Sequence, residues 1–169
     1  QKVEGDFLEV GVWRGGTSAI LGKQLLLCGT GKTLYMADTF TGVVKAGDND
    51  STYSGGEHSD TSIDLVEGLL TKLAPGRFEI LQGIFPDDTA HKVADKQFAL
   101  CHIDVDVYQS AKEVLEWVWP RLSKGGAVVY DDYGFINCDG IIKLVNEQRM
   151  RSDCIIIHNL NGHAIQIKI

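Results

Sequence analysis

The chain of 169 residues is long enough for one domain with a sizeable core, and its 44% hydrophobic and 23% charged residues are typical of a globular protein. Its formal net charge of -7, with no basic stripe, argues against a nucleic-acid partner and favours a small-molecule ligand. No apolar run reaches the roughly 20 residues of a membrane helix, so we expect no membrane contact. Four cysteines without CxxC spacing indicate a reduced, cytoplasmic protein.

Short apolar runs alternate with helical periodicity along the chain. The runs predict strands at 6–10, 33–38, 78–82, 98–104, 127–133, 154–160 and 163–169. Apolar residues at helical spacing predict helices at 17–27, 61–73, 110–122 and 140–149. Thr17 or Ser18 is expected to cap the first helix and Thr61 the second, and Asn161-Gly162 predicts an antiparallel hairpin. The alternation is typical of a single α/β domain with a doubly wound, mostly parallel sheet that ends in this hairpin.

Two of the predicted strands end in paired acids. The run FALCHIDVDVY carries Asp104 and Asp106 after its apolar part, and AVVYDDY carries Asp131 and Asp132 in the same place. Open α/β sheets bind ligands at the carboxyl ends of their strands, so the four carboxylates converge there if the two strands are neighbours. Such a cluster must take up protons or bind cations, and oxygen ligands favour Mg²⁺, Ca²⁺ or Mn²⁺ over zinc. The alternative interpretation is a solvated acidic loop face.

Two histidines accompany the acids. His102 alternates with Asp104 along its strand, so we expect a buried core histidine, with a role as ligand or base as the alternative. His58 lies in a polar stretch at 39–60 that has neither helical nor strand period and is typical of a lid or a disordered loop. His58 is exposed unless such a lid carries it over a substrate.

The turn after the first strand separates two classes of nucleotide ligand. Its glycines do not form GxGxxG, so the turn is not shaped for a dinucleotide pyrophosphate. Glu9, Gly11 and Gly15 instead follow the pattern E-x-G-x-x-x-G, which is similar to that of class I S-adenosylmethionine-dependent methyltransferases. Asp38 ends the second strand, where an acid can accept hydrogen bonds from ribose hydroxyls, and Phe40 could cover the adenine or the ribose. A plain tight turn and a solvated strand end are the alternatives.

Over nearly its whole length the sequence resembles the macrocin O-methyltransferase family. The motifs that carry the resemblance are GDFLEVGVWRGG, ADTFTG, GIFPDD, HIDVDVYQSAKEVLEWVWPRLSKGG and YDDYG. The resemblance implies a Rossmann-like fold, S-adenosylmethionine and Mg²⁺ as cofactors, and methylation of a sugar hydroxyl in antibiotic biosynthesis. It implies Asp104, Asp131 and Asp132 as metal ligands, with Asp104 also the catalytic base and Asp106 a neighbour whose loss does less harm. The cofactor-binding residues it implies are Glu9, Gly11, Trp13, Gly15, Asp38, Thr39, Phe40, Gly83 and Ile84.

The sequence also departs from the family in two places. Family members usually carry an N-terminal lid segment, which we expect to be lacking here. Thr41-Gly42-Val43-Val44 stands where an acid and a Leu-Pro are expected. The acceptor side of that loop is therefore expected to differ. Two further functions remain open: Asp104-Val105-Asp106 as the DxD site of a metal-dependent glycosyltransferase, and a non-catalytic binding domain. A homo-oligomer is consistent with the resemblance.

Overall fold

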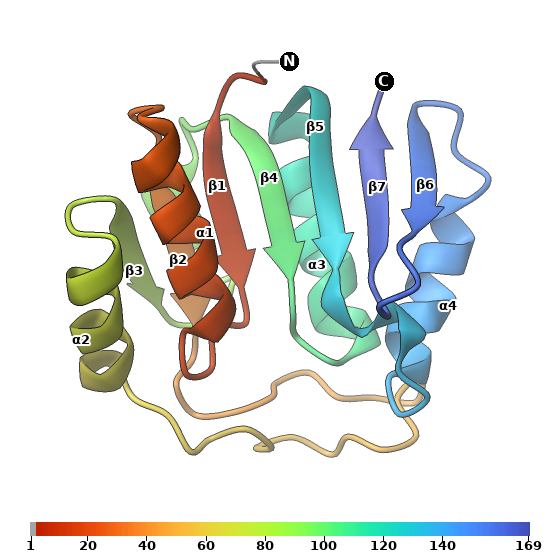
Figure 1. The fold of residues 1–169 in the computed structure, drawn as a ribbon. Helices are drawn as coiled ribbons and strands as arrows, with labels where there is room; N and C mark the ends of the chain where they lie inside the picture. The colour runs from red at the N-terminus through yellow and green to blue at the C-terminus, as the bar shows by residue number, and fades with distance from the viewer. Residues whose placement is uncertain (1–2) are drawn as a thin grey trace.

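The computed structural model describes residues 3–169, which form a sheet of seven strands flanked by helices (Figure 1). The strands are β1 (Asp6–Val10), β2 (Leu34–Asp38), β3 (Phe78–Gln82), β4 (Phe98–Ile103), β5 (Leu122–Tyr130), β6 (Cys154–His158) and β7 (Ala164–Lys168). Their order in the sheet is β3-β2-β1-β4-β5-β7-β6. The first five strands run parallel, and β7 lies antiparallel between β5 and β6. The predicted doubly wound α/β fold with an antiparallel C-terminal hairpin is confirmed.

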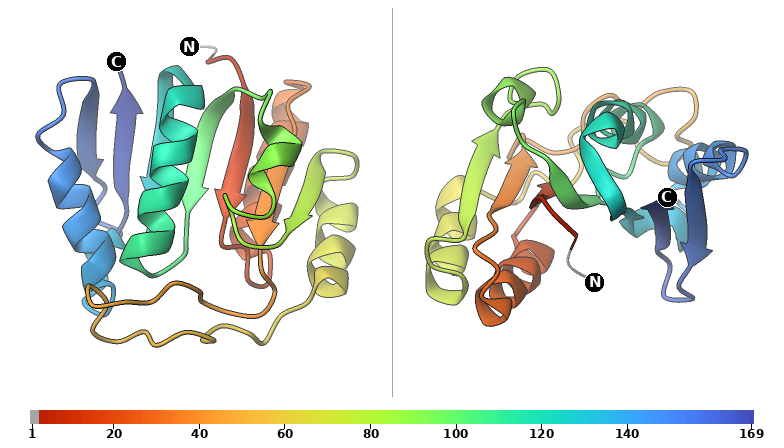
Figure 2. Two further views of the ribbon diagram at one scale, coloured as in Figure 1. Left: turned by 180° about the vertical axis from the view of Figure 1, so that it is seen from behind. Right: turned by 90° about the horizontal axis from the view of Figure 1, so that it is seen from above.

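Helices cover both faces of the sheet, as Figure 2 shows. They are α1 (Gly16–Cys28), α2 (Ile63–Leu73), α3 (Tyr108–Val118) and α4 (Asp139–Gln148). On one face α1 and α2 pack over β1 to β3, where Leu34 and Met36 are fully buried. On the other face α3 and α4 pack behind β4 to β7 around Val128, Val114 and Ile141. Within residues 3–169, the helices are all too short or too polar to cross a membrane.

Both predicted helix caps are wrong, because the polar side chains have other partners. Gly15 occupies the cap position of α1 in a left-handed conformation, with φ of 79°. Ser18 is buried and donates its hydroxyl hydrogen to Glu9 instead. At α2 the cap is Ser62, whose hydroxyl accepts the Leu65 N–H at 3.2 Å. Thr61, the predicted cap, bonds the carbonyl of Trp13 and so ties the start of α2 to the turn after β1.

The predicted neighbourhood of the two acid-bearing strands is confirmed. Strands β4 and β5 pair in parallel, with Ile103 opposite Tyr130 at their carboxyl ends. Asp104 directly follows Ile103 and Asp131 directly follows Tyr130, so the two acids lie at the same height at the end of the sheet. The helix between these strands ends at Val118, four residues earlier than predicted. Pro120 lies in a short 3-10 turn there, because its ring cannot donate a backbone hydrogen bond to continue the helix.

The polar stretch between β2 and α2 is a long loop without helix or strand. Figure 1 shows that it runs beneath the carboxyl ends of the strands toward α4 and then returns to α2. Its far end is anchored, because the Asp50 carboxylate accepts the Tyr108 N–H at 2.8 Å and Lys143 donates to Asn49 at 2.7 Å. Nearer β2, the Ser110 hydroxyl donates to the Val44 carbonyl at 2.8 Å. The loop is therefore held across the edge where ligands are expected.

Candidate active site

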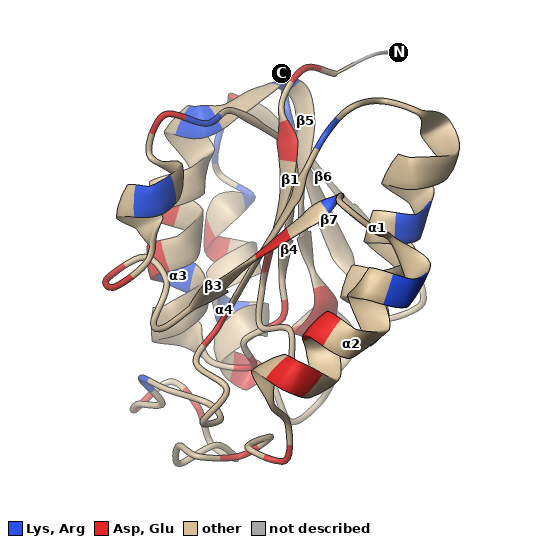
Figure 3. Ribbon diagram, turned by 90° about the vertical axis from the view of Figure 1, so that its left-hand side faces the viewer, with Lys and Arg blue, Asp and Glu red and all other residues tan. Residues whose placement is uncertain are grey.

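A cavity of about 300 Å³ lies between the carboxyl ends of β1, β2 and β4 and the long loop. Figure 3 shows acidic residues on the loops and strand ends at this edge of the molecule. Predicted site residues that line the cavity are Gly11, Trp13, Asp38, Thr39, Gly83, Ile84, Asp104 and Asp131. The structure thus brings the first turn, the end of the second strand and two of the predicted metal ligands to one volume.

Four predicted site residues do not line this cavity: Glu9, Gly15, Phe40 and Asp132. Phe40 packs against the core between α1 and α2, and Gly15 faces Val66 of α2. These two positions contribute to helix packing, and their predicted contacts with the cofactor have no support in the geometry. Glu9 and Asp132 are buried and lie beside the cavity.

The side of the cavity next to β1 and β2 is shaped by backbone groups. Asp38 accepts three backbone N–H groups, from Val12 at 2.6 Å, Trp13 at 2.8 Å and Phe40 at 2.6 Å. Its carboxylate therefore holds the turn after β1 against the end of β2, and its contact with a ribose stays a prediction. Gly11 has φ of 87°, and a Cβ there would lie 1.7 Å from the carbonyl oxygen of Asp104. Only glycine allows this close approach of β1 to β4.

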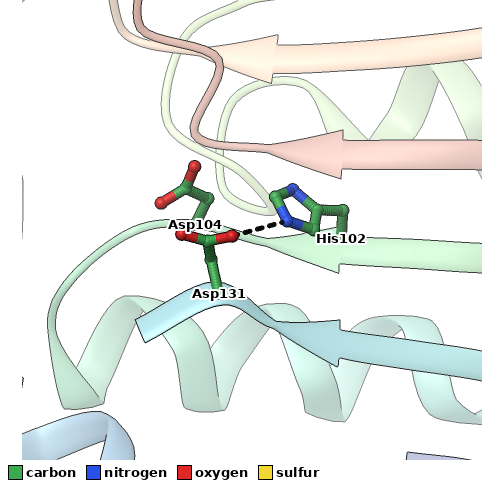
Figure 4. A group of neighbouring side chains, drawn as sticks. All are labelled: His102, Asp104 and Asp131. Carbon is green, nitrogen blue, oxygen red and sulfur yellow. Dashed lines mark hydrogen bonds and ion pairs between the residues drawn. The ribbon is translucent and has the colours of Figure 1, made fainter. Parts of the chain in front are cut away.

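The acid side of the cavity is built from side chains. Ligand atoms of His102, Asp104 and Asp131 all lie within 4.8 Å of one another, and Figure 4 shows the hydrogen bond between His102 and Asp131. Burial and the nearby Asp132 and Asp131 charges raise the pKa of Asp104 to about 8. Burial and the nearby Asp106 and Asp131 charges raise the pKa of Asp132 to about 7. These carboxylates are thus crowded by like charge and are short of cations.

Asp131 differs from the other acids because a histidine neutralises it. The hydrogen bond from His102 lowers the pKa of Asp131, against the opposing effect of burial. Burial alone would lower the pKa of His102, but its contacts with Asp131 and Glu9 outweigh burial and raise that pKa to about 10. His102 is 5% exposed, so the expectation of a buried, hydrogen-bonded histidine is met. It is nevertheless part of the site through its contact with Asp131.

Asp106 connects the acids to the long loop. It lines the cavity, has φ of 65°, and accepts the Tyr53 hydroxyl at 2.6 Å. Its backbone N–H donates to Asp132 at 3.2 Å, so Asp132 supports the backbone at Asp106 from within the core. Asp106, Asp132 and Cys138 form a second group of ligand atoms within 4.8 Å. No sequence pattern indicates Tyr53, because it lies in a loop without periodicity and its partner Asp106 is 53 residues away in the chain.

His58 also lies on the loop; it is exposed, as expected for a loop residue, and it lines the cavity. Its ring centroid is 5.6 Å from that of Trp13, in an edge-on arrangement. The Trp13 ring N–H donates to Asp60 at 2.8 Å, and Arg14 pairs with the same carboxylate. These contacts close the loop over the turn after β1. Val43 and Val44, which replace the expected acid and Leu-Pro, line the cavity as well.

The donor chemistry of the acid side fits a hard divalent cation. Asp104 and Asp131 offer oxygen atoms in one group, and Asp132 offers one in the second group, with Asp106. Mg²⁺ prefers oxygen ligands, usually one or two carboxylates completed by water or substrate. Burial and the repulsion of neighbouring carboxylates both raise the pKa values of Asp104 and Asp132. A bound cation would balance this repulsion.

Comparison with known proteins agrees with this geometry. The sequence model of the family described as Macrocin-O-methyltransferase (TylF) matches residues 1–161. An 8-demethyl-8-(2,3-dimethoxy-alpha-L-rhamnosyl)-tetracenomycin-C 4'-O-methyltransferase from Streptomyces olivaceus is 32% identical over 146 residues, 80% of this chain and 56% of that protein. Mycinamicin III 3''-O-methyltransferase from Micromonospora griseorubida is 30% identical over 167 residues, 91% of this chain and 65% of that protein.

A solved structure gives the same result for the fold. The structure of the O-methyltransferase NovP matches with a TM-score of 0.81 and 26% identity, over 98% of this chain and 72% of that one. The chain spans less than two thirds of the two curated relatives, so their full length includes parts without a counterpart in it. The match to the family model nevertheless covers nearly all of the sequence. The chain belongs to the macrocin O-methyltransferase family.

Proposed function

We propose that this protein is an S-adenosylmethionine-dependent O-methyltransferase that uses Mg²⁺ and methylates a hydroxyl of a sugar or glycosylated small molecule. The observation that carries the proposal is one shared cavity, lined by the glycine turn after β1 and by the acids after β4 and β5. Support for the acceptor class comes from relatives named as O-methyltransferases of a rhamnosyl tetracenomycin and of mycinamicin III. Family membership argues against the glycosyltransferase and binding-only interpretations.

Each side of the cavity has a separate task in this proposal. S-adenosylmethionine supplies an electrophilic methyl group, and Mg²⁺, when bound, lowers the pKa of a hydroxyl beside it. Gly11 lets the backbone approach the cofactor, and Asp38 holds the turn in which it lies. Asp104, Asp131 and Asp132 would hold the cation, and Asp104 would also accept the hydroxyl proton, because it lines the cavity. The loop that carries Tyr53 and His58 excludes water from the cavity.

The cofactor and metal requirements can be tested separately. Calorimetric titration with S-adenosylhomocysteine is expected to show binding that survives EDTA, because the cofactor side uses backbone and Asp38. Methyl transfer to a panel of glycosylated acceptors, followed by mass spectrometry, is expected to stop in EDTA and to return with Mg²⁺. Absence of cofactor binding contradicts the enzyme assignment, and transfer that is indifferent to EDTA contradicts the role of the cation.

A further inference from the structure

A buried histidine links the two sides of the cavity. Glu9 of β1 lies opposite His102 of β4 in the sheet register, and Val129 of β5 lies opposite His102 on its other side. The Nδ1 atom of His102 is 3.2 Å from Oε1 of Glu9, and its Nε2 atom is 3.3 Å from Oδ1 of Asp131. Each ring nitrogen thus faces a carboxylate, whichever of them carries the proton. The ring spans the distance between the first strand and the end of the fifth.

Glu9, at one end of this link, is also held in place. The second carboxylate oxygen of Glu9 accepts the hydroxyl of Ser18 in the first turn of α1, and Glu9 is only 1% exposed. Both oxygens of Glu9 therefore have partners inside the protein. The family resemblance implies Glu9 as a cofactor-binding residue, whereas in the structure its carboxylate bonds Ser18 and faces His102.

At the other end of this link, His102 contacts only one oxygen of Asp131. His102 bonds Oδ1, and Nε2 of His163, from the hairpin of β6 and β7, lies 3.1 Å from the same atom. Among the hydrogen bonds and ion pairs of residues 3–169, none uses Oδ2 of Asp131. Figure 4 shows the Asp131 carboxylate between His102 and Asp104. The arrangement fixes Oδ1, and the contacts of the described residues leave Oδ2 available.

We propose that Glu9 and His102 are positioning residues, which hold Asp131 by its Oδ1 atom so that Oδ2 can bind a divalent cation. The inference rests on the proposed function, because it assumes that Asp131 is a cation ligand. Neither residue then contacts the cofactor or the acceptor. Residues that orient a metal ligand typically change metal affinity by about 10- to 100-fold when they are substituted. We therefore expect Glu9 to affect the cation and to leave the cofactor unaffected.

The test compares Mn²⁺ and S-adenosylhomocysteine affinity in the same variants. Free Mn²⁺ is counted by its electron paramagnetic resonance signal, and cofactor affinity is measured by calorimetry. Glu9→Gln and His102→Asn are expected to weaken Mn²⁺ binding about 10-fold or more, with cofactor affinity within about twofold of the original. Ser18→Ala removes only the hydrogen bond from Ser18 to Glu9 and is expected to give a smaller loss of Mn²⁺ affinity.

A matched control separates positioning from loss of stability. Tyr130→Phe removes another buried hydrogen bond, from the Tyr130 hydroxyl to Gln166 at 2.7 Å, in the residue next to Asp131. It is expected to lower the melting temperature and to leave Mn²⁺ affinity unchanged. If Tyr130→Phe weakens Mn²⁺ binding as much as Glu9→Gln, the effect is general destabilisation and the inference is wrong.

Other outcomes distinguish the inference from the function on which it rests. If the original protein binds S-adenosylhomocysteine but no Mn²⁺, the proposed cation requirement fails first. If it binds Mn²⁺ and Glu9→Gln binds it equally well, only the positioning role fails. Electron spin-echo spectroscopy of bound Mn²⁺ is expected to show no directly bonded nitrogen. A directly bonded nitrogen that disappears in His102→Asn would make His102 a ligand and overturn the proposal. Should His102→Asn not fold, Ser18→Ala and Glu9→Gln still decide the question.

Discussion

The two sides of the cavity are built by different means. On the β1 and β2 side, a left-handed glycine, backbone N–H groups and the single carboxylate of Asp38 shape the turn. On the β4 and β5 side, four acids and a histidine crowd together, and the pKa values of Asp104 and Asp132 are raised. The first side depends on shape and the second on charge. Substitutions that alter shape alone or charge alone should therefore affect different properties.

The largest effect is expected from Gly11→Ala, which tests whether shape governs the first side. The added Cβ would lie 1.7 Å from the Asp104 carbonyl oxygen, at a backbone φ of 87°. We expect a loss of about 3 kcal/mol or more in unfolding free energy, together with the loss of cofactor binding, measured by urea denaturation and calorimetry. Gly16→Ala is the control, because nothing lies within 4 Å of its Cβ position. Equal damage from both variants would contradict the role of close approach.

Asp131→Ala tests the second side by removing charge. We expect methyl transfer at fixed Mg²⁺ to fall by about a hundredfold or more, because a proposed metal ligand is lost. Affinity for S-adenosylhomocysteine should stay within about twofold, since the turn after β1 is untouched. Asp95→Ala, at an exposed acid paired with Lys96, should change neither quantity. A parallel loss of cofactor affinity in Asp131→Ala would show that the two sides are not separable.

A smaller effect is expected from Tyr53→Phe, which loosens the long loop over the acids. The variant loses the 2.6 Å hydrogen bond to Asp106 and keeps the ring. A hydrogen bond to a charged group contributes about 1.5–3 kcal/mol, so we expect KM for the acceptor to rise about tenfold. Tyr133→Phe removes a hydroxyl that bonds Asn146 outside the cavity and serves as the control. An unchanged KM for Tyr53→Phe would exclude the loop contact from acceptor binding.

Stability of the metal-free protein is expected to depend on the raised pKa values of two acids. Asp104 and Asp132 have pKa values of about 8 and about 7 in the folded state, against an ordinary value near 4 for an unfolded chain. The folded state then holds protons that the unfolded state releases, so stability in EDTA should fall as pH rises from about 4 to 8. We expect the melting temperature in EDTA to fall over that range and Mg²⁺ to restore it at pH 8. A melting temperature that rises with pH in EDTA would contradict these shifts.

Local patterns in the sequence predicted the order of the elements and several residues that line the first side of the cavity. The bounds predicted for β1 and β3 match the structure, because turn residues flank both runs. The close approach of other backbone groups to Gly11 is consistent with its place in the short E-x-G-x-x-x-G motif. The four acids after β4 and β5 were also identified, because both pairs follow apolar runs. Their hydrogen-bond partners were not identified. Whether Glu9 faces the cofactor or His102 depends on strand β4, which lies 93 residues away in the chain.

Tyr53 and the helix caps show a second limit of sequence reasoning. A hydroxyl can cap a helix or bond a distant group, and the tertiary partner decides which bond forms. The hydroxyl groups of Ser18 and Thr61 both bond such distant groups and do not cap their helices. The contact of Tyr53 with Asp106 joins a loop to a strand end, and no periodicity in the loop indicates which side chain faces inward.

The strand order also has a consequence for the time course of folding. Strands β1, β2 and β3 follow one another in both sequence and space, so their contacts close short stretches of chain. The central pair, β1 with β4, joins residues about 90 positions apart, and contacts of that separation form slowly. During synthesis the ribosome must complete β4 before Glu9 can meet His102. We therefore expect the cofactor turn to acquire protection from hydrogen exchange before the acid cluster does.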